Sequence, residues 1–154
     1  MKKLSIFLLL LLFAVTLLLT GCSGEDILAF GSDDIEITDR FFILQVQEIH
    51  SNVEEYLGRT IRYEGMFRSV HWAPLDRDYH YVIRYVDSCC GPGGSIGFEV
   101  YFEDGNISPV PENAWVAVAG VLDEYEEEGM YHLRLIVTSI TALEERGQEL
   151  VSLQ

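Results

Sequence analysis

The feature that most constrains the fold is residues 79–102, where two segments with alternating apolar residues flank a glycine-rich stretch. Alternation with a period of two is typical of strands, because successive side chains point to opposite faces of a sheet. Between the two segments, residues 91–94 (Gly-Pro-Gly-Gly) favour a tight, exposed turn. We therefore predict a β-hairpin over residues 79–102, with Cys89 and Cys90 at its turn.

Three further segments alternate or form a continuous apolar run: residues 60–68, 115–122 and 130–142. Within the first, Gly65 predicts a bulge or bend. Residues 35–50 fit either an alternating strand or one face of a helix, and their β-branched and aromatic content favours a strand. Together the segments predict a mainly β domain with little helix: a small antiparallel, five- to six-stranded, OB-like barrel. Because no helix fits between the third and fourth strands, we expect the barrel to be partly open.

The amino terminus has the pattern of an export signal. Lys2 and Lys3 precede an apolar run over residues 4–19, and small residues lie ahead of Cys22. With Leu19 three positions before Cys22, this stretch resembles the lipobox of bacterial lipoproteins, in which the cysteine is lipidated. The resemblance implies a palmitate-bearing anchor on Cys22 and a lipid-anchored location on the extracytoplasmic side of the cell membrane. An uncleaved transmembrane anchor is the alternative, because the run is near the lower limit of a bilayer span.

The chain is thus predicted to have four parts. Residues 1–21 are a lipoprotein signal peptide, and residues 22–34, rich in Gly, Ser and acidic residues, are a tether. Residues 35–142 form the OB-like β domain, in which residues 52–58 are a short helical turn and residues 69–78 a loop. Residues 143–154 are a C-terminal tail or a short helix.

The formal net charge of −15 at pH 7 limits the possible ligands. Such a surface repels nucleic-acid backbones and anionic lipid head groups, so contact with the membrane is expected only through the lipid on Cys22. The acidity suits cations or basic partners, and equally a soluble surface with no specific ligand. The glutamates at positions 126–128 are expected to form a solvated turn, with a cation site as the alternative.

Cys89 and Cys90 are the only cysteines besides Cys22, so no disulfide framework is expected. Thiolates bind zinc and copper strongly, but a metal site needs ligands beyond this pair. His80 is the preferred addition because it lies in the same hairpin, and the other candidates are His71, Asp87 and His132. A strained, easily reduced disulfide suited to redox sensing is a second interpretation, and structural packing in the turn is a third.

No nucleophile, base and acid occur at a recognisable catalytic spacing, so the chain is not expected to be an enzyme. Aromatic residues in and before the central hairpin are candidates for a partner-binding surface, although tyrosines also pack in cores: Trp72, Tyr79, Tyr81 and Tyr85. The expected function is that of a binding or accessory domain for an unknown ligand. The alternative is a thiol-based metal-binding or redox-sensing protein centred on Cys89 and Cys90.

Several segments resemble a family of uncharacterised bacterial proteins. They are residues 54–61 (EEYLGRTI), 64–67 (EGMF), 81–85 (YVIRY) with the cysteine pair that follows, and 115–120 (WVAVAG). Over residues 35–142 the chain is similar to the soluble OB-like, paired-cysteine domain of the small subunit of two-subunit permeases, and to stand-alone lipoprotein relatives of that domain. The pair is followed here by Gly-Pro-Gly-Gly, where the permease subunits have an Ala-Asp-Ala-like segment. The resemblance implies an OB-like fold and association with a membrane permease or another envelope protein; it implies no activity.

Overall fold

The computed structural model describes residues 34–88, 91–103 and 110–152. Its elements, in chain order, are β1 (Asp34–Glu36), η1 (Asp39–Phe41), α2 (Phe42–Ser51), α3 (Val53–Tyr56), β2 (Thr60–Trp72), β3 (Arg77–Ser88), β4 (Gly91–Tyr101), β5 (Trp115–Glu127), β6 (Met130–Ala142) and β7 (Leu150–Val151).

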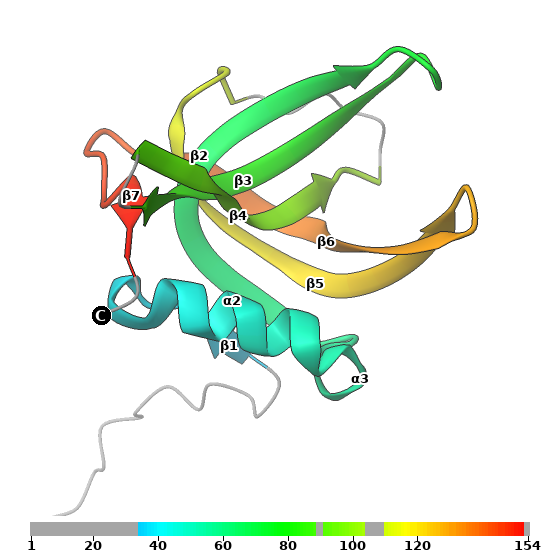
Figure 1. The fold of residues 1–154 in the computed structure, drawn as a ribbon, viewed down its shortest axis with the longest axis horizontal. Coiled ribbons are helices and arrows are strands. Elements are labelled where there is room, and N and C mark those ends of the chain that lie inside the picture. The colour runs from blue at the N-terminus through cyan, green and yellow to red at the C-terminus, as the bar shows by residue number, and fades with distance from the viewer. Residues whose placement is uncertain (1–33, 89–90, 104–109, 153–154) are drawn as a thin grey trace, which may run out of the picture. The chain divides into compact units, whose positions relative to one another are not determined.

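Five long strands form a closed barrel (Figure 1). Neighbouring strands follow the order β2-β5-β6-β4-β3, and β3 pairs again with β2. The β4–β6 pair is parallel, and the other pairs around the barrel are antiparallel. The short strands β1 and β7 add in parallel to β2 and β3. The predicted small, mainly β, OB-like barrel is thus confirmed, but it is closed and mixed where we expected it to be partly open and antiparallel.

The barrel interior is filled by alternate residues of the strands. Side chains that are at most 3 % exposed come from all five long strands, among them Phe67, Val82, Phe98, Val118, Leu122 and Leu135. Strand β2 closes the barrel, because its first half pairs with β5 and its second half with β3. The change of partner occurs at Met66, which pairs with both strands. At the preceding residue, Gly65, an added Cβ would lie 3.0 Å from the carbonyl oxygen of Ile83. The pairing of β2 with β5 continues through Gly65 without a register shift, so the bulge predicted as one alternative is absent. The close approach of β3 excludes a side chain at this position.

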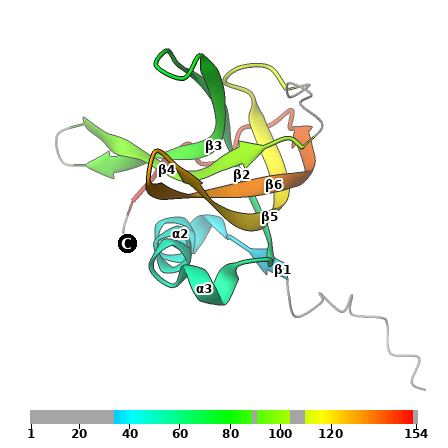
Figure 2. The ribbon, with the colours of Figure 1, turned by 90° about the vertical axis from the view of Figure 1, so that its right-hand side faces the viewer.

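Residues 42–51 form helix α2, so the strand predicted over residues 35–50 is wrong except for Ile35 and Glu36, which belong to β1. Figure 2 shows α2 lying across one end of the barrel. The Phe42 ring is 5.7 Å from the Tyr63 ring of β2, measured between centroids. One helical face is buried there, at the spacing of successive turns: Phe42, Ile43, Val46 and Ile49. Burial of this face against the barrel outweighs the β-branched content that favoured a strand.

Three boundaries also differ from the predictions. The loop expected over residues 69–78 is shorter, because β2 continues to Trp72 and β3 begins at Arg77. The glycine-rich residues 91–94 belong to β4, so the connection of the hairpin falls on residues 89–90, outside the described residues. The C-terminal segment includes the short strand β7. Helix α3 confirms the turn predicted within residues 52–58, and none of the helices described is long and apolar enough to cross a bilayer.

Candidate functional site

A cleft of about 200 Å³ opens between the hairpins β2–β3 and β5–β6. The two hairpins project from the same side of the barrel in Figure 1. Residues two apart on one strand point the same way, so each strand of the two hairpins supplies a pair of side chains to the cleft, and β4 adds Glu99. Four of these side chains are aromatic: Trp72, Tyr79, Tyr81 and Tyr125. Three are carboxylates: Glu99, Glu127 and Glu128.

This position is the one at which OB barrels bind their ligands, on the face of the second and third strands between two connecting loops. The corresponding connections here are the turns after β2 and after β5. Trp72 is 50 % exposed beside the first of them. A half-exposed tryptophan in a concave surface is available to stack on a ligand, whereas a tryptophan of the core is not.

Glu127 holds two side chains at the β3 side of the cleft. Its Oε2 accepts a hydrogen bond of 2.5 Å from the Tyr79 hydroxyl, and its Oε1 lies 2.7 Å from Arg77 Nη1. The guanidinium of Arg77 also lies over the Tyr79 ring, 4.7 Å from its centroid. The hydrogen bond to Glu127 raises the pKa of Tyr79 to about 12, so the phenol stays protonated at neutral pH.

Glu99 is the most buried carboxylate of the cleft, with 8 % of its surface exposed. Burial raises the pKa of Glu99, and a hydrogen bond of 2.7 Å from the Tyr125 hydroxyl to Oε2 partly offsets this rise. Burial and the same hydrogen bond raise the pKa of Tyr125. A buried acid with a raised pKa in a cleft marks a candidate functional site.

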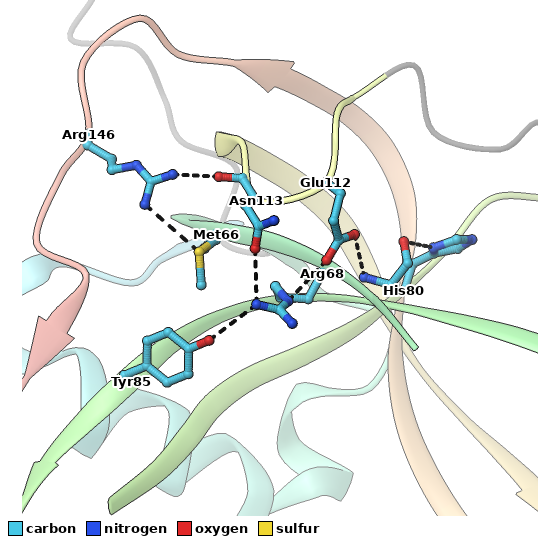
Figure 3. A network of polar contacts seen from close by, with 8 residues as sticks. Met66, Arg68, His80, Tyr85, Glu112, Asn113 and Arg146 are labelled. Atoms are coloured by element: carbon cyan, nitrogen blue, oxygen red, sulfur yellow. Dashed lines mark hydrogen bonds and ion pairs between the residues drawn. The ribbon is translucent and has the colours of Figure 1, made fainter. Parts of the chain in front are cut away.

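Three of the four aromatic residues predicted for a partner surface therefore come together, and the fourth does not. Tyr85 lies outside the cleft, in the network of Figure 3. Its hydroxyl is 3.4 Å from Arg68 Nη1, which also donates to Asn113 Oδ1 at 3.0 Å. Arg146 donates to the Asn113 carbonyl oxygen at 2.6 Å. This network ties the segment before β5 and the C-terminal segment to β2, so Tyr85 has a structural role.

Sequence reasoning missed Tyr125 and Glu99 and assigned Glu127 and Glu128 to a solvated turn. Glu126 is exposed but lies in β5, and Glu128 is exposed in the turn as predicted, although it also lines the cleft. Glu127, which is half-buried in β5, departs from the prediction. The available signal was the alternation of Tyr125 with Glu127 on one strand face. Its meaning depends on β3 and β4 lying opposite that face, which the local sequence does not specify.

Cys22, Cys89 and Cys90 lie outside the described residues, so the thiol chemistry proposed for the cysteine pair stays a prediction. The histidines proposed as additional ligands contact different neighbours. His80 Nδ1 is 2.9 Å from Ser69 Oγ (Figure 3), and its ring stacks on that of Phe67. His71 Nδ1 is 2.8 Å from Asp78 Oδ1, whereas the His132 ring stacks on Tyr125. Among the residues described, no three His, Cys, Asp or Glu side chains are grouped to hold a metal ion.

A second cavity, of about 470 Å³, is lined by residues 36–39 and by residues of β2, β3, β5 and β6. Its two arginines are already paired with carboxylates, Arg62 with Asp34 at 3.1 Å and Arg84 with Asp39 at 2.7 Å. The side chain of Arg84 is 1 % exposed, and its Nε donates to the Glu64 carbonyl oxygen at 2.8 Å. These contacts attach the amino-terminal segment to the barrel, and they indicate a structural role for this region.

Comparison with known proteins gives one match. The model of the DUF1980 C-terminal domain matches residues 26–150, which include the whole barrel, α2 and the cleft. No curated protein matches the chain. No solved structure matches it either. Since the matched segment covers most of the sequence, the chain belongs to the DUF1980 C-terminal domain family.

Proposed function

We propose that the protein is a non-enzymatic, lipid-anchored binding or accessory domain on the extracytoplasmic side of the cell membrane, with the cleft as its ligand site. The observation that carries the proposal is the convergence of Trp72, Tyr79 and Tyr81 on a cleft at the ligand position of OB barrels. Concave surfaces with aromatic walls and a few polar groups are the usual form of binding sites.

The lipid anchor is supported by the lipobox-like pattern that ends at Cys22. Replacing Cys22 with serine removes the thiol to be acylated, so the variant should take up no labelled palmitate and should lose its lipid-dependent membrane association. Cys89→Ser is the matched control, because it removes another thiol and leaves the lipobox intact. Continued palmitate labelling of the Cys22→Ser protein would refute the anchor.

A membrane permease, or another envelope protein, is the proposed partner. Its support is the resemblance of residues 35–142 to the small subunit of two-subunit permeases. Leu75 lines the cleft and Leu57 does not, yet their exposures are similar, at 39 % and 41 %. A photo-crosslinking amino acid at position 75 should therefore give an adduct with a permease or other envelope protein in intact cells, and one at position 57 should not. Adducts of equal yield from both positions, or none from position 75, would refute the cleft as the contact site.

A further inference from the structure

The cleft has the chemistry of a cation site. Of its lining residues, three are glutamates, four are aromatic and none is lysine or arginine. Aromatic ring faces attract cations through the ring quadrupole, and the attraction grows where water is excluded. The chain as a whole has a net charge of −15, which adds a long-range attraction for positive ligands and repels anions.

Two guanidinium groups at the margins of the cleft already lie over tyrosine rings and pair with carboxylates. Arg77 lies 4.7 Å from the Tyr79 ring centroid and pairs with Glu127. Arg134 lies 4.7 Å from the Tyr125 ring centroid and pairs with a carboxylate outside the cleft. A tyrosine face beside a carboxylate is thus an arrangement that this barrel uses repeatedly to hold an arginine.

The ion pairs of these two arginines are with Glu127 and Asp123, and the arginines act on Glu99 only without direct contact, lowering its pKa against the rise caused by burial. Neither Glu99 nor Glu128 has an ion-pair partner among the described residues. Glu99 is 8 % exposed and lies beside the Tyr125 hydroxyl. Ionising a buried carboxylate that has no ion pair still costs free energy, and a positive ligand in the cleft would recover part of that cost.

We propose that the cleft binds a basic segment of a partner protein and receives one lysine or arginine side chain between its aromatic rings. The inference rests on the proposed function and specifies its ligand. A volume of about 200 Å³ is below that of pockets for whole drug-sized molecules, about 300–1,000 Å³, and suits a single long side chain. Two apolar side chains that line the cleft are also largely exposed, Val70 at 47 % and Met130 at 58 %, and the neighbouring residues of a bound segment would cover them.

The test is a calorimetric titration of the purified protein with an acetylated, amidated pentalysine peptide. Trp72→Ala removes the exposed ring and Glu128→Gln removes an unpaired charge, and each should weaken binding roughly tenfold. Glu126→Gln is the matched charge control, because it loses the same charge one strand position from Glu127, outside the cleft. Phe41→Ala is the aromatic control, with a ring 47 % exposed away from the cleft. Both controls should change the dissociation constant less than about twofold.

Several results would overturn the inference. Equal weakening by Glu126→Gln and Glu128→Gln would mean a diffuse attraction to an acidic surface. Tetramethylammonium binding as tightly as pentalysine would mean a small organic cation instead of a protein segment. An uncharged pentapeptide or oligosaccharide that binds as well as pentalysine would exclude recognition by charge. Absence of cleft-dependent pentalysine binding, together with a permease adduct from position 75, would reject this ligand and leave the proposed function standing.

Discussion

Replacing Arg84 with methionine should lower the free energy of unfolding by about 2 kcal/mol. The Arg84 side chain is 1 % exposed and attaches the amino-terminal segment to the barrel through Asp39. Its Nε donates to the Glu64 carbonyl oxygen at 2.8 Å, just before the point where β2 begins to pair with β3. Its guanidinium lies between two rings, 4.3 Å from the centroid of Phe42 and 5.2 Å from that of Trp115.

The magnitude follows from these contacts and from the cost of burying the charge. A hydrogen bond from a charged donor contributes about 1.5–3 kcal/mol, and a desolvated cation–π contact about 2 kcal/mol. The ion pair adds at most about 1 kcal/mol, because the side chain of Asp39 is 63 % exposed and water screens it. Burial of the guanidinium opposes these gains by several kcal/mol, and its Nη1 is buried without a hydrogen-bond partner among the described residues. The difference is a net stabilisation of about 2 kcal/mol.

Urea denaturation followed by far-ultraviolet circular dichroism measures this difference without relying on the fluorescence of the adjacent Trp115. Asp39→Asn is the companion variant, and it should cost about 1 kcal/mol or less because water replaces the exposed carboxylate. If Arg84→Met were neutral or stabilising, the contacts of the guanidinium would do no more than offset its burial. The reasoning given for its role would then be wrong.

Three further outcomes are expected. Gly97→Ala should lower the free energy of unfolding by about 3 kcal/mol or more, because its Cβ would lie 2.1 Å from a carbonyl oxygen of β3. Gly129→Ala meets no atom within 4 Å and should lower it by only about 1 kcal/mol. Similar losses for the two variants in urea denaturation would contradict this reasoning. Since the folded-state pKa of Tyr79 is about 12, above the usual 10.0, its contribution to stability is complete below pH 10 and is lost as the pH rises towards 12. Because the hydrogen bond to Glu127 raises this pKa, Glu127→Gln should shift the appearance of the Tyr79 phenolate absorbance to lower pH. Burial raises the pKa of Glu99, so the folded state is stabilised as the pH falls through that pKa. Glu99→Gln at pH 7 should therefore leave the free energy of unfolding unchanged or higher. A clear loss of stability would show that the ionised form of Glu99 is stabilising.

The strands were predictable because the alternation of a strand is a local property. Residues 60–68 and 130–142 each have one face rich in apolar side chains, and one dry face is enough to specify a strand without knowledge of its partners. The same reasoning located the hairpin over residues 79–102 and identified Trp72 and Tyr81 as candidates for a binding surface. The OB-like architecture follows from the number of such strands and their short connections.

What the sequence did not determine depends on contacts between distant segments. Residues 42–51 fit the periodicity of a strand and that of a helix. They are helical because a helix buries one apolar face against the end of the barrel. The cleft has the same origin: Glu99 and Tyr125 are 26 positions apart in the chain, and they meet because β4 and β5 both flank β6. The sequence by itself thus determined the strands and a set of aromatic candidates, since those depend on local side-chain alternation. The tertiary structure alone decided which candidates share a site with buried acids, because the order of strands in a closed barrel is a property of long-range pairing.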